Sequence, residues 1–319
     1  MSDAPEVHGR GVSDAPEVHG RGVSDAPEVH GRGVSDALWR DVLVDTEAAL
    51  GNARDARLLC EHAAGLTASE FTAALNDAVT QRMAVHLHAM IRRRLAGEPL
   101  QYVMGRWAFR HLDLMVDPRV LIPRPETEQV AEVALGHARA ASPRVVVDLG
   151  TGSGAIGLSL AQELPLDNTT VWMTDASHDA LDVARANAAG LGRAASNVRI
   201  AHGDWYSALP TMLRGGVDVI VSNPPYIAHA DPNVEPAVVA HEPHSALFSG
   251  PDGLDALRVV VMGAREWLRP AGALVVEIGH EQGTVVQQLC IESDLCDAQV
   301  LRDASGRDRI VTARYQLHR

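Results

Sequence analysis

The most specific chemical pattern in this chain is formed by four consecutive residues, Asn223, Pro224, Pro225 and Tyr226. Two adjacent prolines fix the backbone and lack N–H donors, so the nearby carbonyl oxygens stay free to accept hydrogen bonds. The Asn223 side-chain oxygen and the Pro224 carbonyl can accept the two protons of one NH2 group, while Tyr226 packs on its flat face. The pattern predicts a pocket that orients a planar amide or amine nitrogen. A simple strand-ending turn is the alternative interpretation.

A glycine-rich loop occupies residues 148–154, with the sequence Asp-Leu-Gly-Thr-Gly-Ser-Gly, between an apolar run and a helical pattern. Glycines at such a turn let the backbone bend tightly and approach a ligand closely. Asp175 ends the next apolar run, where a carboxylate can accept hydrogen bonds from both hydroxyls of a ribose. The loop alone could be a plain tight turn, but together with Asp175 it predicts a site for a nucleoside-containing cofactor.

The spacing of the glycines distinguishes between cofactors. A nicotinamide dinucleotide prefers G-x-G-x-x-G, whereas this loop has G-x-G-x-G, which resembles motif I of the class I S-adenosylmethionine methyltransferases. Such enzymes hold the adenine after the third strand, where this chain has Asp204 and Trp205; Trp205 could equally be a core tryptophan. The candidate cofactor-binding residues are Asp148, Gly150, Thr151, Gly152, Ser153, Gly154, Asp175, Asp204, Trp205 and Asn223.

These residues fall into a regular alternation of strand-like and helix-like segments. Such alternation is typical of a mostly parallel sheet with helices on both faces, which binds ligands beyond the carboxyl ends of its strands. The spacing predicts strands at 145–147, 171–174, 198–201, 217–221, 273–278 and 310–315, and helices at 155–164, 177–189 and 254–268. We therefore expect an α/β, Rossmann-like catalytic domain at 123–319.

The segment before this domain has a different pattern. Ala- and Leu-rich stretches with helical spacing, together with Thr67 and Ser69 as candidate caps, predict a small helical domain at 35–98. Gly97 and Pro99 end it. Residues 99–122 are expected to form a linker, in which 102–116 is predicted to be extended and to contain a β-hairpin.

The first 34 residues contain an exact eleven-residue repeat, SDAPEVHGRGV, at 2–12, 13–23 and 24–34. Each unit has one proline, two glycines and only two valines as sizeable apolar groups, so it buries too little surface to offset the entropy of ordering. We expect residues 1–34 to be a disordered tail. The alternative is a metal- or partner-binding repeat that uses one histidine per unit.

Composition excludes several classes of protein. The net charge of −13 and the complete absence of lysine disfavour extensive phosphate contacts and exclude a phosphate-binding loop of the G-x-x-x-x-G-K type. Three scattered cysteines do not suggest a disulfide framework or a metal site. The absence of a visible secretory signal or long apolar run predicts a cytoplasmic protein with no membrane partner.

Further segments narrow the assignment. Residues 98–105 read Glu-Pro-Leu-Gln-Tyr-Val-Met-Gly, and 116–128 read Val-Asp-Pro-Arg-Val-Leu-Ile-Pro-Arg-Pro-Glu-Thr-Glu. Together with Asn223–Tyr226, His241-Glu242-Pro243, 250–254 and Glu277-Ile278-Gly279, they resemble the peptide chain release factor glutamine methyltransferases. The resemblance extends from about Leu38 to the C-terminus.

This resemblance implies transfer of a methyl group from S-adenosyl-L-methionine to the side-chain amide of the glutamine in the Gly-Gly-Gln loop of peptide chain release factors. It implies a helical domain that helps dock this protein substrate, with no metal and no direct nucleic-acid requirement. The implied catalytic residues are Asn223, Pro224 and Tyr226. The implied substrate-binding residues are Asn223, Pro224, Pro225, Tyr226, Arg124, Glu126 and Thr127. Residues 123–128 also fit a helix start, with a proline and acidic residues in the first turn.

Three other functions remain open from the residues alone. Asn-Pro-Pro-Tyr also occurs in adenine and guanine methyltransferases that act on nucleic acids, although these would need a basic recognition surface. A glutamine methyltransferase that acts on a ribosomal protein is a second alternative. The third is a cofactor-binding or docking protein without turnover, which the intact loop at 148–154, Asp175 and Asn223–Tyr226 disfavour.

Overall fold

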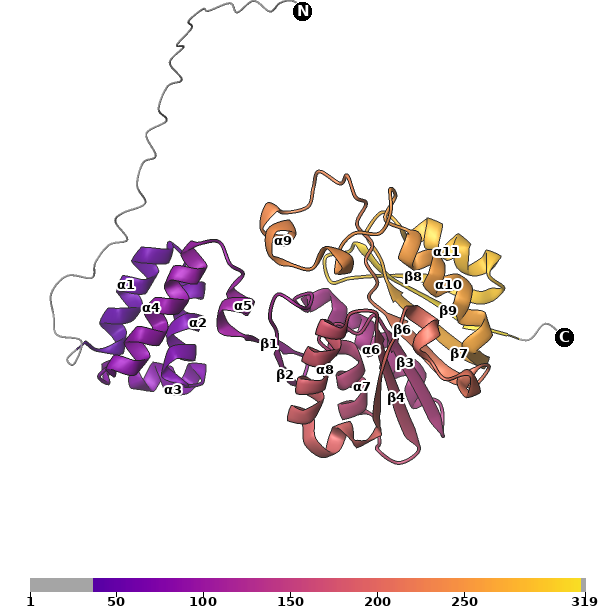
Figure 1. The fold of residues 1–319 in the computed structure, drawn as a ribbon, viewed down its shortest axis with the longest axis horizontal. Coiled ribbons are helices and arrows are strands. Elements are labelled where there is room, and N and C mark those ends of the chain that lie inside the picture. The colour runs from indigo at the N-terminus through magenta and orange to yellow at the C-terminus, as the bar shows by residue number, and fades with distance from the viewer. Residues whose placement is uncertain (1–36, 317–319) are drawn as a thin grey trace, which may run out of the picture.

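The computed structural model describes residues 37–316. The three repeats, and the prediction that they are disordered, lie outside the described residues. The described part has a bundle of short helices followed by an α/β domain, with a short helix and a hairpin between them (Figure 1). Among the helices of residues 37–316, none is long and apolar enough to cross a membrane.

The helices of the N-terminal bundle are α1 (Trp39–Leu50), α2 (Ala53–Ala64), α3 (Ala68–Ala73) and α4 (Gln81–Leu95). Helices α2, α3 and α4 each begin directly after a residue whose side chain caps the helix, and apolar residues of all four helices form the core. The Asn52 side chain accepts a hydrogen bond from the Asp55 backbone N–H, and Thr67 forms a reciprocal capping box with Glu70. Trp39 and Phe71 meet edge to face in the core of the bundle.

The segment between the two parts differs from the expectation at its start. Helix α5 (Leu100–Met104) precedes the hairpin of β1 (Arg106–Phe109) and β2 (Leu112–Met115), so the extended conformation predicted for residues 102–104 is wrong. The helix forms because Leu100 and Val103 complete the core of the bundle. The local sequence pattern did not indicate that these residues pack against the bundle.

A seven-stranded sheet organises the second part, and its strand order is β5-β4-β3-β6-β7-β9-β8. The first five are parallel, whereas β9 pairs antiparallel with both β7 and β8. This confirms the prediction of a mostly parallel sheet, although the edge strand β8 was not predicted. The strands are β3 (Arg144–Leu149), β4 (Thr169–Asp175), β5 (Val198–His202), β6 (Val217–Ser222), β7 (Leu268–Glu277), β8 (Leu295–Arg302) and β9 (Asp308–Tyr315).

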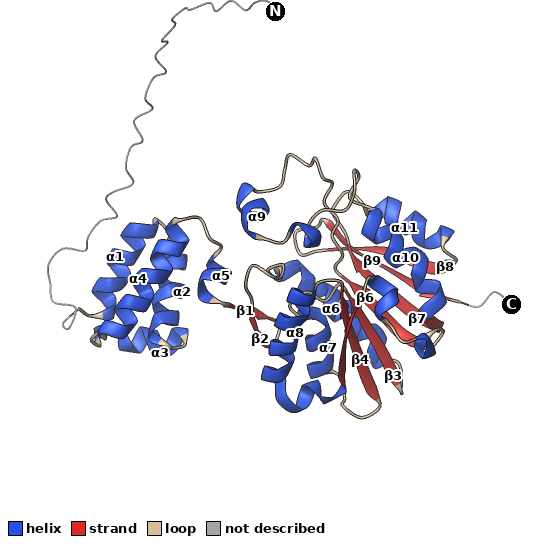
Figure 2. Cartoon of the chain, viewed as in Figure 1, coloured by secondary structure: helices blue, strands red, loops and turns tan. Residues whose placement is uncertain are grey.

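Helices cover both faces of this sheet (Figure 2). Val146 and Val219 face one apolar cluster, which includes residues of α6, α7 and α8. Val147 and Ile220 face the opposite cluster, which includes residues of α10 and α11. This alternation buries both faces of the parallel strands, as expected from their side-chain period of two. The covering helices are α6 (Pro125–Arg139), α7 (Ala155–Glu163), α8 (His178–Leu191), α10 (Asp255–Trp267) and α11 (Gly283–Glu292), while the short α9 (Pro236–His241) lies apart from the sheet (Figure 2).

Two of these helices begin as their residue types predict. Pro125 is the first residue of α6, with Glu126 and Glu128 in its first turn, where acidic groups meet the positive end of the helix dipole. Ser177 caps α8 by accepting a hydrogen bond from the Ala180 N–H. Both helix starts lie beside the carboxyl ends of strands, where the candidate site forms.

Candidate functional site

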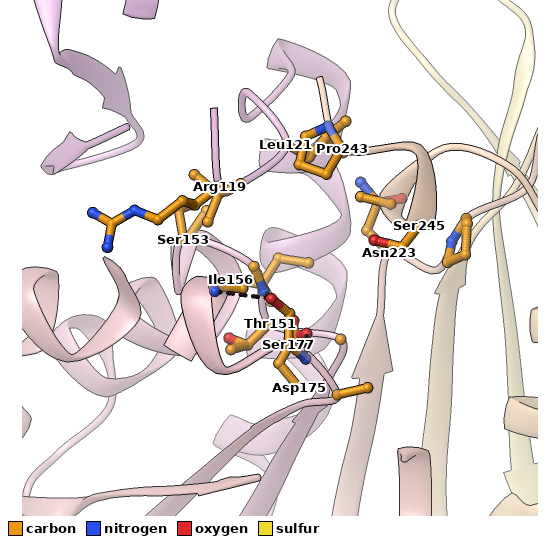
Figure 3. Close-up of a pocket in the computed structure, with 18 of the residues that line it drawn as sticks. Arg119, Leu121, Thr151, Ser153, Ile156, Asp175, Ser177, Asn223, Pro243 and Ser245 are labelled. Carbon is orange, nitrogen blue, oxygen red and sulfur yellow. Dashed lines mark hydrogen bonds between the residues drawn. The ribbon is translucent and has the colours of Figure 1, made fainter. Parts of the chain in front are cut away.

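The chain runs outward from β3 to β4 and β5 on one side, and returns through β6 and β7 on the other. Parallel sheets bind ligands at such a reversal, beyond the carboxyl ends of their strands. A cavity of about 440 Å³ lies there. Figure 3 shows Thr151, Asp175 and Ser177 in one part of it and Asn223 and Ser245 in another.

The glycine-rich loop forms one wall of the cavity. Gly150, Gly152 and Gly154 all have positive φ, which allows the chain to turn from β3 into α7. Residues 150–153 line the cavity. Gly154 does not, and it is required for another reason, because a Cβ atom there would lie 2.8 Å from the Met173 side chain.

Asp148 supports this loop from beneath and does not line the cavity. Its carboxylate accepts hydrogen bonds from the Thr151 hydroxyl at 2.5 Å and from the Gly157 N–H at 2.9 Å. Burial raises the pKa of Asp148 to about 6. Asp148 therefore acts on the cavity through the conformation of the loop.

Asp175 lies at the end of β4 and lines the cavity. One of its oxygens accepts from the Gly152 N–H and the other from the Ser177 N–H, each at 2.9 Å. Burial raises the pKa of Asp175, although these backbone N–H groups oppose the shift. The carboxylate therefore joins the glycine-rich loop to the start of α8 and faces the cavity.

Asp204 and Trp205, which follow β5, also line the cavity. Asp204 is exposed, whereas Trp205 is half-buried and packs against the core cluster that includes α10. A Cβ atom on Gly150 would lie 3.5 Å from the Trp205 ring, so the indole sits directly over the glycine. Trp205 thus forms both cavity wall and core edge, and the two interpretations of this residue are compatible.

The Asn-Pro-Pro-Tyr segment continues from β6 on the other side of the cavity. Asn223 and Pro225 line the cavity, whereas Pro224 and Tyr226 are not among the lining residues. Tyr226 donates its hydroxyl proton to Glu277 at 3.2 Å, and its carbonyl accepts from the Gln282 side chain at 3.0 Å. Burial and the neighbouring Glu277 raise the pKa of the Tyr226 hydroxyl.

Arg124, Glu126 and Thr127, which were predicted to bind the substrate, differ in whether they line the cavity. Thr127 lines the cavity, and its hydroxyl oxygen lies 3.3 Å from the Asn223 amide nitrogen. Arg124 does not line it and forms an ion pair with the buried Glu242. Glu126 is exposed at the start of α6 and does not line the cavity either. Of these three, only Thr127 meets Asn223.

Glu277, which lies behind the cavity wall, and several lining residues had no individual role in the sequence interpretation. Glu277 is 1% exposed at the end of β7 and accepts hydrogen bonds from both Thr127 and Tyr226. An acid at the carboxyl end of the strand beside β6 was the signal that could have found it. The lining residues without an assigned role are Arg119, Val120, Leu121, Pro123, Ala155, Ile156, Ala176, Ser177, Ala180, Pro243, Ser245 and Ala246.

Two family models match the chain. One describes a methyltransferase small domain and matches residues 127–247, and the other describes a PrmC N-terminal domain and matches residues 42–105. Two similar proteins are named release factor glutamine methyltransferase. That of Xylella fastidiosa strain 9a5c is 43% identical over 85% of this chain and 92% of its own length. That of Moorella thermoacetica is 43% identical over 81% of this chain and 90% of its own length.

The chain belongs to the release factor glutamine methyltransferase family. As a member of this family it is an S-adenosylmethionine-dependent methyltransferase, with the class I, Rossmann-like catalytic fold and an N-terminal helical region. A solved release factor-specific protein-(glutamine-N5) methyltransferase from Alicyclobacillus acidocaldarius is 28% identical, with a TM-score of 0.38 over 63% of this chain and 99% of that chain. The family assignment rests on the sequence relatives, because they cover most of both chains.

The cavity walls fit the cofactor of a release factor glutamine methyltransferase. The glycine-rich backbone and the Asp175 carboxylate supply close approach and hydrogen-bond acceptance for a ribose, and the Trp205 ring supplies an apolar face for a purine. Within residues 37–316, no three His, Cys, Asp or Glu side chains are grouped to hold a metal ion.

Proposed function

We propose that this protein transfers a methyl group from S-adenosyl-L-methionine to the side-chain amide nitrogen of the glutamine in the Gly-Gly-Gln motif of peptide chain release factors, leaving S-adenosyl-L-homocysteine. The observation that supports it most is the position of Asn223, which faces the same cavity as Gly150, Asp175 and Trp205. The amide that accepts the methyl group and the cofactor can therefore share one cavity. The names of the relatives support the release factor as the substrate.

An amide nitrogen is a poor nucleophile because its lone pair is delocalised into the carbonyl group. The protein must therefore align this nitrogen and bind its protons as charge shifts toward it. In the proposed arrangement, the Asn223 side-chain oxygen and the Pro224 carbonyl each accept one proton of the substrate NH2 group. Pro225 borders the same space, and Tyr226 supports the segment from behind through Glu277. Bound S-adenosylmethionine would supply the electrophilic methyl group, and the methylated nitrogen would release one proton to water.

The cofactor half of the site follows from the other wall. We propose that Asp175 accepts the ribose hydroxyls, that Trp205 covers the adenine, and that Gly150–Ser153 approach the cofactor through their backbone. Asp204 borders the adenine region from an exposed position. Asp148 and Gly154 act through the shape of the loop, since one holds Thr151 and the other leaves space for Met173.

We further propose that residues 35–98 help to dock the release factor and that the reaction takes place in the cytoplasm. The observation behind the docking role is the place of the bundle, which stands beside the catalytic part and joins it through α5 (Figure 1). Arg124 and Glu126 lie at the start of α6, which follows α5 and the hairpin in the chain. We propose that they contact the peptide around the glutamine.

The decisive experiment measures radiolabelled methyl transfer from S-adenosylmethionine to a purified release factor, a ribosomal protein and DNA in parallel. We expect label only in the release factor, with none when the glutamine of its Gly-Gly-Gln motif is replaced by alanine. Peptide mass spectrometry would place the methyl group on that glutamine. Label in DNA or the ribosomal protein, with none in the release factor, would refute the assignment.

A further inference from the structure

Glu277 is a buried carboxylate beside the proposed acceptor site, and it contacts neither the substrate nor the cofactor in the proposed reaction. It ends β7, next to β6, the strand that Asn223 directly follows, and is 1% exposed. One of its oxygens accepts from the Thr127 hydroxyl at 2.7 Å, and the other accepts from the Tyr226 hydroxyl at 3.2 Å. Burying a carboxylate is costly unless its oxygens are hydrogen-bonded, so these two hydroxyl donors stabilise the ionised form of Glu277.

Thr127 links this carboxylate to Asn223. Its hydroxyl oxygen lies 2.7 Å from a Glu277 oxygen and 3.3 Å from the Asn223 amide nitrogen. A hydroxyl has one proton, and a carboxylate can only accept. The Thr127 hydroxyl therefore donates its proton to Glu277. Its oxygen can then only accept a hydrogen bond from Asn223. Asn223 must then turn its NH2 group to Thr127 and its carbonyl oxygen away from Thr127.

We propose that Glu277 is a positioning residue, which acts through Thr127 to hold the Asn223 carboxamide in the one orientation that presents its oxygen to the substrate NH2 group. This inference rests on the proposed function, because only a substrate that donates protons needs that oxygen. The reversed amide would present two donors to the two protons of the substrate. Such an arrangement repels the substrate amide instead of aligning it.

We call the hydrogen bonds from Glu277 through Thr127 to Asn223 the relay. The groups around Glu277 determine the pH range in which this relay operates. Burial raises the pKa of Glu277 to about 7, while the Thr127 and Tyr226 hydroxyls and the Arg309 guanidinium lower it and Glu126 raises it further. Arg309 is anchored on the Ile278 carbonyl at 3.2 Å. When Glu277 is protonated, its own O–H can donate to Thr127. The Thr127 proton is then free to bind the Asn223 oxygen, and the constraint on the amide is lost.

Thr127→Val and Thr127→Ser test the link. Valine keeps the shape and removes the hydroxyl, so we expect kcat to fall about a hundredfold, as for a misplaced reacting group, with little change in affinity for S-adenosylmethionine. Serine keeps the hydroxyl and should restore most of the activity. Glu277→Gln should resemble the valine variant, because its amide can donate to Thr127. Equal kcat values for the valine and serine variants would overturn the relay.

A matched control separates lost positioning from lost stability. Thr169 is 5% exposed at the start of β4, at the edge of the sheet opposite the cavity, where its hydroxyl donates to the Pro165 carbonyl and accepts from the Arg144 guanidinium at 3.0 Å. Thr169→Val removes a buried hydroxyl in the same way and should lower the melting temperature without changing kcat. A fall in kcat for Thr169→Val equal to that for Thr127→Val would show that the effect is general destabilisation.

The pH dependence gives a readout that a purely structural role would not change. In the wild-type protein and in Thr127→Ser, kcat should rise with pH through about 7 as Glu277 ionises. In Thr127→Val and Glu277→Gln this rise should be absent. The first change removes the hydroxyl that links Glu277 to Asn223, and the second removes the group that ionises. A rise of the same size in Thr127→Val would overturn the proposal.

A second measurement requires no protein substrate. Selective asparagine ¹⁵N labelling gives side-chain NH2 signals, and the Asn223 pair is identified by its loss in Asn223→Ala. These signals should shift with pH through about 7 in the wild-type protein and in Thr127→Ser, and not in Thr127→Val. This shift without methylation of a release factor would refute the proposed function and leave the relay intact. Methylation without this shift would refute the relay alone.

Discussion

The Tyr102 hydroxyl donates a hydrogen bond to the Val120 carbonyl at 2.5 Å, and Val120 lines the cavity. Tyr102 belongs to α5, whose neighbours Leu100 and Val103 pack in the core of the helical bundle. Tyr102 itself packs in the core cluster that includes α6 and α7. A single five-residue helix therefore joins the bundle to one wall of the candidate site.

Tyr102→Phe removes this bond while keeping the ring. The buried Val120 carbonyl would lose its partner, so we expect the free energy of unfolding to fall by about 1–3 kcal/mol. Urea denaturation measures this change. Tyr315→Phe is the control, because that tyrosine is only partly buried at the end of β9 and has no side-chain hydrogen bond among the described contacts. Equal unfolding free energies for wild type and Tyr102→Phe would show that the bond adds no stability.

Asp175→Ala should weaken the binding of S-adenosylmethionine. The change removes an acceptor for two ribose hydroxyls, and hydrogen bonds to charged groups contribute about 1.5–3 kcal/mol, so the dissociation constant should rise about tenfold to a hundredfold. Part of this loss would come through the glycine-rich loop, since Asp175 also accepts from the Gly152 N–H. Calorimetric titration of the folded variant with S-adenosylmethionine measures this change. An unchanged dissociation constant would show that Asp175 does not bind the cofactor.

Asn223→Ala should cut turnover strongly and largely spare cofactor binding. Removing one preorganised polar partner of a transition state costs about a hundredfold to a thousandfold in rate. Single-turnover methyl transfer to a release factor measures this, beside cofactor titration and thermal melting. Near-normal transfer by a folded Asn223→Ala protein would contradict the amide-orienting role.

The comparison with Asn223→Asp isolates the acceptor. Aspartate keeps an oxygen but cannot donate to Thr127, which lies 3.3 Å from the Asn223 nitrogen. It also brings a negative charge close to the cofactor. We expect partial activity and an altered cofactor affinity, measured in the same two assays. Activity as low as that of the alanine variant would mean that an oxygen at this position is not sufficient.

Glu277 should make the stability of the protein depend on pH. Burial raises its pKa from 4.5 in the unfolded chain to about 7 in the folded protein, so between these values only the folded state holds the proton. Its contribution to stability is therefore fully present below about pH 4.5 and is lost as the pH rises through about 7. The stability of the wild type relative to Glu277→Gln should fall across this window, which urea unfolding at several pH values measures. Parallel curves would contradict the raised pKa.

Asp148 shifts in the same direction, because burial raises its pKa to about 6. Both proteins in this comparison contain Asp148, so its contribution cancels in the difference. The expected loss of stability runs opposite to the expected gain in kcat with rising pH. A shared cause such as global unfolding could not produce both trends.

Sequence spacing alone was sufficient to predict the mostly parallel sheet and to bring three of the candidate residues to its carboxyl edge. Gly150, Asp175 and Asn223 each follow an apolar run, and parallel strands bring such positions to one edge of a sheet. Local start signals likewise placed α6 at Pro125 and α8 after Ser177. These features depend on residues close together in the chain, whose types report directly on local backbone conformation.

The roles of individual side chains depended on contacts between distant residues. The sequence did not show that Asp148 lies beneath the loop, where one oxygen of its carboxylate accepts hydrogen bonds from Thr151 and Gly157. The proposed substrate contact of Arg124 stays a prediction, and the sequence did not show that this residue pairs with Glu242, which is 118 positions away in the chain. The helix α5 formed where strands were expected, because a core elsewhere in the chain received its apolar face.

Glu277 shows this limit most clearly. The chain by itself determined that an acid follows an apolar run there, two residues before a glycine. Only the tertiary structure decided that this acid is buried, that it meets Thr127 across 150 positions of the chain, and that its pKa rises. Desolvation and hydrogen bonding depend on which strands pair and which helix covers them, and these are properties of the whole fold rather than of any local pattern.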